Sequence, residues 1–195
     1  MEEKGYIRKQ GIRSRYLGLR NNLSAGERKQ KSQEIWEHVK GDPKYQAARA
    51  VLVYMDYRSE VMTTGLVEEL LADTSKKVFA PKVEGMHIRF YEIKSLDELK
   101  KGYQGIREPE ENPEKRFTPD MAARLEAVVL VPGAAFDRQR GRIGYGKGFY
   151  DRFFSDYGEV YGIALSFSCQ IAKEIPMEPH DRRPDIIVTE NGIIR

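Results

Sequence analysis

The sequence contains few of the residues that build disulfides and metal centres. Cys169 is the only cysteine among 195 residues, which excludes an intrachain disulfide and a Cys-x-x-Cys metal site. The three histidines, His38, His87 and His180, are too far apart for the usual zinc-binding spacings. The longest stretch without a charged residue, residues 160–172, is shorter than the roughly 18 to 20 apolar residues of a membrane span. A zinc site and a membrane-spanning helix are therefore not expected.

The chain also lacks a large excess of charge of either sign. It carries 33 Lys and Arg residues against 30 Asp and Glu residues, a net charge of +3, which permits an anionic partner without requiring one. A length of 195 residues favours one domain, which we predict to cover residues 1–195. The opening segment MEEKGYIRKQ has no apolar core of the secretory-signal type, so a cytoplasmic location is expected.

The first forty residues predict two helices. Ser24 and Glu27 have the spacing of a capping box, so the second helix is expected to begin at Ser24. Ile35 and Val39 form part of an apolar stripe on that helix, which Gly41-Asp42-Pro43 should end.

Five short apolar runs follow and predict the strands of a sheet. They are continuous rather than alternating and rich in Val and Ile, which is typical of parallel strands buried on both faces. Helical segments such as residues 63–71 separate several of them, which indicates an α/β fold. The segment His87–Ile93 predicts an antiparallel edge hairpin, and residues 102–119 predict a long loop. The five runs are residues 50–55, 78–80, 127–131, 160–166 and 185–189.

The segment from Val131 to Arg152 carries the clearest chemical signal. A buried strand is followed by a loop dense in glycine and then by a predicted helix from Gly148 to Phe154. Glycine permits positive φ and lets the backbone approach a ligand closely, so successive N–H groups can converge on an anion. Arg142 and Lys147 add positive charge there, which predicts a polyphosphate site. The glycines are Gly141, Gly144, Gly146 and Gly148.

This loop differs from the two common nucleotide-binding motifs. Gly141 to Lys147 satisfies the G-x-x-x-x-G-K pattern of a P-loop, but Gly148 stands where a P-loop has the Ser or Thr that binds Mg²⁺. Asp151, four residues after Lys147, offers a carboxylate to a hard cation instead. The glycine spacing departs from the Rossmann fingerprint, so a nicotinamide cofactor is not expected.

Residues 132–152, PGAAFDRQRGRIGYGKGFYDR, resemble the signature of the 5-formyltetrahydrofolate cyclo-ligase family, also called methenyltetrahydrofolate synthetases. Other family patterns are matched along nearly the whole chain. The matches are Lys9-x-x-Ile12-Arg13, Glu60-Val61 with Thr63, Gly105-Ile106 with Glu108-Pro109, Gln170, Pro176, His180-Asp181 and Asp185.

The resemblance implies an activity and a fold. The activity is the ATP- and Mg²⁺-dependent conversion of 5-formyltetrahydrofolate to 5,10-methenyltetrahydrofolate, with release of ADP and phosphate. In the implied mechanism the formyl oxygen attacks the γ-phosphate, and N10 then closes the ring and expels phosphate. The implied fold is α/β, with three Rossmann-like layers and a mostly parallel central sheet between flanking helices. It is related to the folds of sugar-phosphate isomerases and CoA transferases.

The resemblance also assigns roles to individual residues. Arg142 and Lys147 are the catalytic cations, and Asp151 and Asp185 are the expected metal ligands. Residues expected at ATP are Lys9, Arg13, Arg142, Ile143, Gly144, Tyr145, Gly146, Lys147, Gly148, Phe149 and Tyr150. Residues expected at the folate substrate are Met55, Glu60, Tyr145, Gly146, Lys147, Gly148 and Phe149. The folate substrate is expected with or without a polyglutamate tail. The protein is expected to be a monomer or a weak homodimer, and to bind neither nucleic acid nor a membrane.

Taken without the resemblance, several of these residues have plainer interpretations. Lys9 and Arg13 lie one helical turn apart, as on a solvated helix face, and Asp151 has the position of an ordinary first-turn acid. His180-Asp181 is interpreted as part of a structural surface loop. Two alternative functions stay open at this point: phosphoryl transfer to another substrate, and nucleic-acid binding by the basic N-terminal helix.

Overall fold

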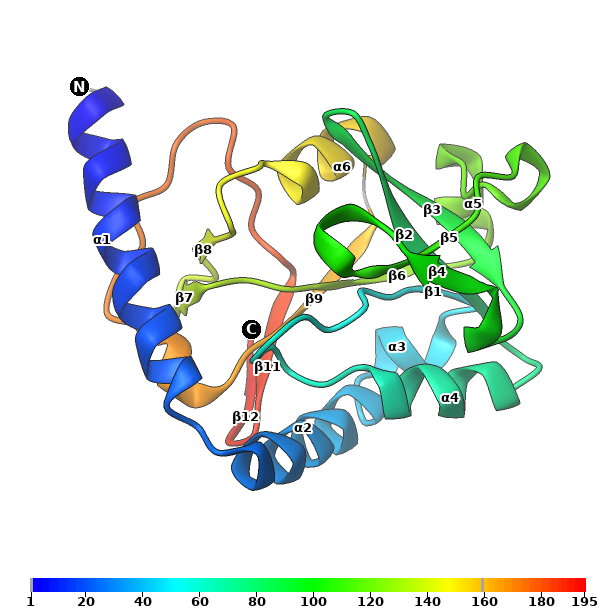
Figure 1. The fold of residues 1–195 in the computed structure, drawn as a ribbon, viewed down its shortest axis with the longest axis horizontal. Coiled ribbons are helices and arrows are strands. Elements are labelled where there is room, and N and C mark those ends of the chain that lie inside the picture. The colour runs from blue at the N-terminus through cyan, green and yellow to red at the C-terminus, as the bar shows by residue number, and fades with distance from the viewer. Residues whose placement is uncertain (1, 159) are drawn as a thin grey trace.

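A seven-stranded mixed sheet runs through the middle of the protein (Figure 1). The computed structural model describes the backbone of residues 2–158 and 160–195, and the side chains from Arg8 onward. In spatial order the strands are β12 (Gly192–Ile194), β11 (Ile186–Thr189), β9 (Tyr161–Leu165), β6 (Val128–Val131), β1 (Ala50–Leu52), β2 (Lys77–Glu84) and β3 (His87–Ile93). The strands from β11 to β2 are parallel, whereas β12 and β3 pair antiparallel at the two edges.

The sheet confirms the predicted parallel strands and the predicted edge hairpin. Each of the five apolar runs coincides with at least part of a strand, and β3 pairs with β2 along its whole length. Strand β12 was not predicted. It has only three residues and begins at the glycine of Asn191-Gly192, a dipeptide typical of hairpin turns, with Gly192 at φ 119°.

Helices cover both faces of the sheet, which gives three layers (Figure 1). On one face lie α2 (Ala25–Lys40), α3 (Pro43–Ala47) and α4 (Thr64–Ala72), and on the other lie α5 (Pro119–Arg124) and α6 (Phe149–Tyr157). Helix α2 begins as predicted, because the Ser24 side chain accepts from the Glu27 amide and Glu27 caps the Ser24 amide in return. Among the described residues, no helix combines the length and apolar character that a membrane crossing requires.

Alternate residues of each central strand enter the two cores. Val128 and Leu130 of β6 pack toward α2, α3 and α4, whereas Val129 and Val131 pack toward α5 and α6. Because both faces of the strand are covered, its sequence is continuously apolar. Each such side chain contributes about 1.5 to 3 kcal/mol by its burial.

The long helix α1 (Glu2–Asn21) stands to one side of the layered sheet (Figure 1). Its Ile12 and Tyr16 pack on a small sheet of β7 (Ala135–Asp137), β8 (Arg142–Ile143) and β10 (Ile171–Ala172). This arrangement places α1 beside the glycine-rich segment, although more than 120 residues separate them in sequence.

The predicted loop over residues 102–119 is more ordered than expected. It contains β5 (Arg107–Pro109), which pairs with β4 (Leu99–Lys101), and short 3₁₀ turns at Tyr103–Gly105 and Pro113–Lys115. The chain reverses at Gly105, whose φ is 84°. Two further 3₁₀ turns, Leu96–Glu98 and Ser168–Gln170, lie outside this segment.

Candidate active site

A pocket of about 1080 Å³ opens where β1 and β6 end. Tyr54 and Met55 follow β1 and Pro132 follows β6, and all three line the pocket. Its other walls come from α1, the glycine loop (residues 141–148), the start of α6, the β2–β3 hairpin and residues 103–108 and 178–182. Ligands of parallel α/β sheets bind outside the carboxyl ends of the strands, and this pocket lies at that edge.

The glycines of the loop serve two different purposes. Gly146 and Gly148 have φ values of 88° and 63°, which a side chain would strain. Gly141 and Gly144 do not have positive φ. Gly141 is needed for close approach, since a Cβ there would lie 2.7 Å from Oδ2 of Asp137. Gly148 is the N-cap residue of α6, and as a glycine it has no side chain to accept a hydrogen bond from the first amides of the helix. An anion could accept from these amides instead.

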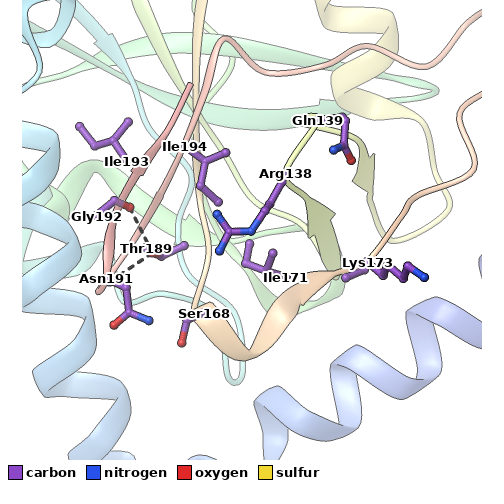
Figure 2. A pocket seen from close by; sticks show the side chains of 11 residues that line it. Arg138, Gln139, Ser168, Ile171, Lys173, Thr189, Asn191, Gly192, Ile193 and Ile194 are labelled. Carbon is purple, nitrogen blue, oxygen red and sulfur yellow. Dashed lines mark hydrogen bonds between the residues drawn. The ribbon is translucent and has the colours of Figure 1, made fainter.

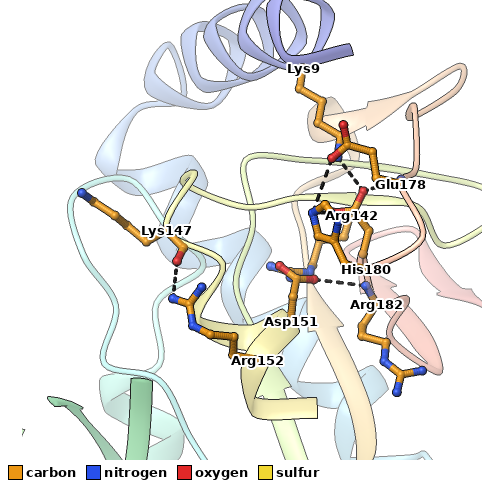
Figure 3. Close-up of polar contacts among 9 residues, drawn as sticks. Lys9, Arg142, Lys147, Asp151, Arg152, Glu178, His180 and Arg182 are labelled. Atoms are coloured by element: carbon orange, nitrogen blue, oxygen red, sulfur yellow. Dashed lines mark hydrogen bonds and ion pairs between the residues drawn. The ribbon is translucent and has the colours of Figure 1, made fainter. Parts of the chain in front are cut away.

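Arg142 lies at the base of the loop as a buried cation. Its side chain is 4% exposed, and Nη2 donates to Oδ1 of Asp151 at 2.8 Å (Figure 3). Among the described residues, its Nε has no hydrogen-bond partner although it is buried. A buried donor left unpaired in this way indicates a place for an external acceptor. The predicted cation is therefore at the site, held by the predicted metal ligand Asp151.

Lys147 does not join Arg142 in this structure. The residue is exposed, and its side chain points away from Arg142 and Asp151 (Figure 3). Its carbonyl accepts a hydrogen bond from Nη2 of Arg152, which fixes the backbone and leaves the side chain in solvent. A lysine side chain is long and flexible, so the position of Lys147 in the loop does not by itself determine the direction in which its charge points.

The predicted ATP contacts on α1 face the pocket rather than bulk solvent. Nε of Arg13 donates to the carbonyl of Gly144 at 2.8 Å. Nζ of Lys9 lies 2.8 Å from Oε2 of Glu178 and 2.5 Å from Oδ2 of Asp181. Burial lowers the pKa of Lys9, but the bonds and charges of these two carboxylates outweigh it and raise the pKa overall. These contacts account for basic residues that had motivated the nucleic-acid alternative.

The segment from Glu178 to Arg182 forms an acidic wall of the pocket. Ligand atoms of Glu178, His180 and Asp181 lie within 4.8 Å of one another. The Arg182 amide donates to Oδ1 of Asp151 at 3.1 Å, so this wall is joined to α6. The sequence had indicated only a structural loop for His180-Asp181. Its match to the family's C-terminal pattern was the signal that could have placed it here.

Asp185 lies outside the pocket. It precedes β11, and its Oδ2 accepts from the Gly162 amide at 2.7 Å. The amino end of β11 is at the opposite edge of the parallel sheet from the pocket, so the structure does not bring Asp185 to Asp151.

The predicted folate residues gather at the other end of the pocket. Met55 and Glu60 are buried, and Oε1 of Glu60 accepts from the Tyr145 hydroxyl while Oε2 accepts from the Tyr57 amide at 2.9 Å. Burial raises the pKa of Glu60, and the bonds from Tyr145 and Tyr57 oppose this rise. Phe149 packs edge-on against Tyr103 with ring centroids 6.0 Å apart.

Several lining residues at this end, among them Arg20 and Tyr103, were not assigned to the site from the sequence. Arg20 donates to the Tyr145 hydroxyl, Tyr103 packs on Phe149, and Met86 is 63% exposed at the hairpin tip. Arg20 counted only as one basic residue of the helix. The local sequence gave no signal that connects it with Tyr145, which is 125 residues away.

A second pocket, of about 620 Å³, shares no lining residue with the first (Figure 2). It lies between β10, β12 and the turn after β7, and Arg138 reaches into it while Lys173 points away. None of the site residues predicted from the sequence lines it.

The three-layer fold and the cation-lined pocket at the ends of its parallel strands define an α/β enzyme with a ligand-binding site. A family model described as the 5-formyltetrahydrofolate cyclo-ligase family matches residues 6–190. The 5-formyltetrahydrofolate cyclo-ligase of Mus musculus is 28% identical over 94% of this chain and 94% of its own length. That of Saccharomyces cerevisiae is 32% identical over 75% of this chain and 78% of its own length. The chain belongs to the 5-formyltetrahydrofolate cyclo-ligase family.

Solved structures agree with this membership. The structure of Aquifex aeolicus 5,10-methenyltetrahydrofolate synthetase matches with a TM-score of 0.82 and 32% identity, over 96% of this chain and 92% of that chain. A 5,10-methenyltetrahydrofolate synthetase from Mycoplasma pneumoniae, at 22% identity and a TM-score of 0.72, has the same fold. The protein is therefore an enzyme of folate metabolism with cyclo-ligase activity.

Proposed function

We propose that the pocket binds ATP and 5-formyltetrahydrofolate side by side and yields 5,10-methenyltetrahydrofolate, ADP and phosphate. The observation that carries this proposal is the buried Arg142, whose Nε lacks a partner among the described residues at the base of the glycine loop. A phosphate oxygen is the acceptor that best fits a guanidinium at a glycine-rich turn before a helix.

The nucleotide end of the pocket is assigned to α1 and the glycine loop. Lys9 and Arg13 reach this end from α1, and the loop backbone from Arg142 to Tyr150 lines it. Arg142 would hold the terminal phosphate, and Lys147 would turn inward to join it once phosphate charge is present. These cations supply positioning and charge neutralisation, which phosphoryl transfer needs more than a protein nucleophile.

The donor groups near Asp151 fit a magnesium ion. Mg²⁺ prefers carboxylate oxygens, and Asp151, Glu178 and Asp181 present them on one side of the pocket. We propose Asp151 and Asp181 as the ligands. Asp185, expected from the resemblance, is not at this place. When bound, the ion would neutralise phosphate charge as the phosphoryl group is transferred.

The folate end is assigned to Met55, Glu60 and the residues from Tyr145 to Phe149. The Glu60 carboxylate can accept hydrogen bonds from the N–H donors of a pterin ring, and the buried Met55 offers an apolar wall. We place Tyr145 of the glycine loop and Phe149, the first residue of α6, between this end and the nucleotide end, since both line the pocket. This arrangement would bring the formyl oxygen to the terminal phosphate.

The test is to follow methenyl product absorbance with purified protein, 5-formyltetrahydrofolate, ATP and Mg²⁺. We expect one ADP per product, and no turnover when ATP is omitted or Mg²⁺ is chelated. Product formation without ATP would refute the proposal. A panel of other small phosphoryl acceptors separates folate from a different substrate, because the proposal expects ADP release only with the folate.

Three expectations stay predictions beside this proposal. They are the relationship of the fold to sugar-phosphate isomerases and CoA transferases, the cytoplasmic location, and a monomeric or weakly dimeric state.

A further inference from the structure

A buried arginine on α1 is joined through one tyrosine to the carboxylate that we assign to folate. Arg20 is 4% exposed, and its Nη1 donates to the Tyr145 hydroxyl at 2.7 Å. That hydroxyl donates in turn to Oε1 of Glu60, which is 8% exposed. Guanidinium, hydroxyl and carboxylate thus form a directed chain of hydrogen bonds, in which each bond polarises the next.

Arg20 also fixes the backbone segment that carries Glu60. Its Nε donates to the hydroxyl of Ser59, the residue before Glu60, at 3.0 Å. Ser59 donates in turn to Oδ1 of Asn21 at 2.5 Å, and Nη1 of Arg20 also lies 3.4 Å from the Gly133 carbonyl. These contacts direct Arg20 toward the protein, so it acts on its neighbours rather than on a phosphate.

The surroundings of Glu60 contain one cation among the groups that shift its pKa. Burial raises that pKa, Asp56 raises it further, and the Tyr145 and Tyr57 bonds and the Arg20 charge lower it. A buried carboxylate without a compensating charge would take up a proton. The titratable and charged groups that face Glu60 are Arg20 from α1, Tyr54 and Asp56 after β1, Tyr145 from the glycine loop and Tyr150 from α6.

We propose that Arg20 is a positioning residue for the folate substrate, which holds the Glu60 carboxylate charged and in place through Tyr145. This inference rests on the assignment of Glu60 to folate made above. It explains why a buried charge is kept on a helix whose Lys9 and Arg13 are assigned to the nucleotide end. In this proposal the Tyr145 hydroxyl accepts from Arg20 and donates to Glu60, and so connects the two.

The test compares Arg20→Gln with Arg15→Gln, the same change at an exposed position of α1 outside the pocket. For Arg20→Gln we expect the KM for 5-formyltetrahydrofolate to rise about tenfold at pH 7. The KM for ATP should stay within about twofold, as should both constants in Arg15→Gln. The acidic limb of kcat/KM for folate should move to higher pH in Arg20→Gln, because removal of the cation favours the protonated carboxyl.

Two further variants separate this role from a purely structural one. Arg20→Lys keeps the charge, so its acidic limb should lie where it does in the wild type. Its KM for folate should lie between those of the wild type and Arg20→Gln, because lysine cannot make all the hydrogen bonds of the guanidinium. In a Tyr145→Phe background the connecting hydroxyl is absent, so Arg20→Gln should raise the folate KM much less than it does in the wild type. Thermal unfolding of every variant identifies those that fold, and the comparison uses these.

An unchanged folate KM and acidic limb in folded Arg20→Gln would overturn the role of Arg20, as would an equal effect in the Tyr145→Phe background. If Glu60→Gln also leaves the folate KM unchanged, the assignment of Glu60 to folate fails as well. If Glu60→Gln raises that KM while Arg20→Gln does not, only the role of Arg20 fails.

Discussion

Arg142 and Asp151 form an ion pair across the glycine loop, with Nη2 and Oδ1 2.8 Å apart. Arg142 belongs to β8 and Asp151 to the first turn of α6, so the pair joins the two ends of the loop. The partnership leaves Nε of Arg142 without an acceptor among the described residues. A predicted catalytic cation and a predicted metal ligand are therefore direct partners in the structure.

Replacing Arg142 by alanine should remove a charge-assisted contact to phosphate. We expect a loss of about 1.5 to 3 kcal/mol at the transition state, or roughly 10- to 150-fold in kcat/KM for ATP. Arg138→Ala is the matched control, because that exposed arginine lines the second pocket. Steady-state kinetics of both variants measure the difference. Wild-type kcat/KM in Arg142→Ala would show that no phosphate meets this side chain.

Magnesium dependence should distinguish three aspartates. Asp151→Asn and Asp181→Asn are each expected to raise the Mg²⁺ concentration needed for half-maximal rate about tenfold or more, because a carboxylate ligand is lost. Asp185→Asn should leave that concentration unchanged, since Asp185 binds the Gly162 amide outside the pocket. The measurement is a Mg²⁺ titration at saturating ATP. A shift confined to Asp185→Asn would reverse our assignment.

Folate binding should weaken as the solution becomes acidic. Burial raises the pKa of Glu60 above its ordinary value, so its carboxylate takes up a proton at higher pH than a solvated glutamate would. We expect the KM for 5-formyltetrahydrofolate to rise as the pH falls through this raised pKa, while the KM for ATP does not follow it. Glu60→Gln should raise the folate KM and abolish this limb. Persistence of the limb in that variant would assign it to another group.

Alanine at Gly148 should harm both stability and nucleotide binding. The φ of 63° costs a side chain about 1 to 2 kcal/mol, and the new Cβ would lie 2.9 Å from Nη1 of Arg152. Gly158→Ala is a close control, since Gly158 has φ 67° at the other end of α6 and open space around it. We expect both variants to unfold at lower denaturant concentration, but only Gly148→Ala to raise the KM for ATP. Equal ATP kinetics in the two variants would contradict a role for the loop in nucleotide binding.

Loss of the α2 cap should affect stability alone. Ser24→Ala removes the side chain that accepts from the Glu27 amide and should cost about 1 kcal/mol of unfolding free energy. Ser14→Ala, within α1, offers the same change without a cap. Urea denaturation measures the difference, and kcat should be unchanged in both. A fall in kcat for Ser24→Ala would connect α2 with the chemistry.

Local sequence patterns predicted the parts of the fold that local physics decides. Continuous apolar runs gave the parallel strands, and Ser24 with Glu27 gave the start of α2, because burial on two faces and helix capping both leave a short-range signature. Strand β12 was not predicted because three residues are too few to show a periodic pattern. The glycine loop was found from its composition, but φ values had to come from the structure: two glycines are needed for conformation and Gly141 for space.

The site was harder to predict because it depends on contacts between distant segments. Asp181 and Asp185 lie four residues apart, and only the direction of the parallel strands shows that one lies at the pocket and the other at the far edge. Arg20 meets Tyr145 across a separation of 125 residues, which no spacing rule can detect. The side-chain direction of Lys147 likewise depends on packing rather than on its place in the motif.

The position of α1 has a consequence for motion. The two large cores contain no buried side chain of the described part of α1, which instead meets the small sheet and the pocket rim through Ile12, Tyr16, Lys9 and Arg13. Its backbone amides should therefore exchange with deuterium sooner than those of the central strands. Nucleotide would bind against α1 as well as against the strand ends. Saturation with ATP should therefore slow the amide exchange of α1 and reduce the mobility of this side of the pocket.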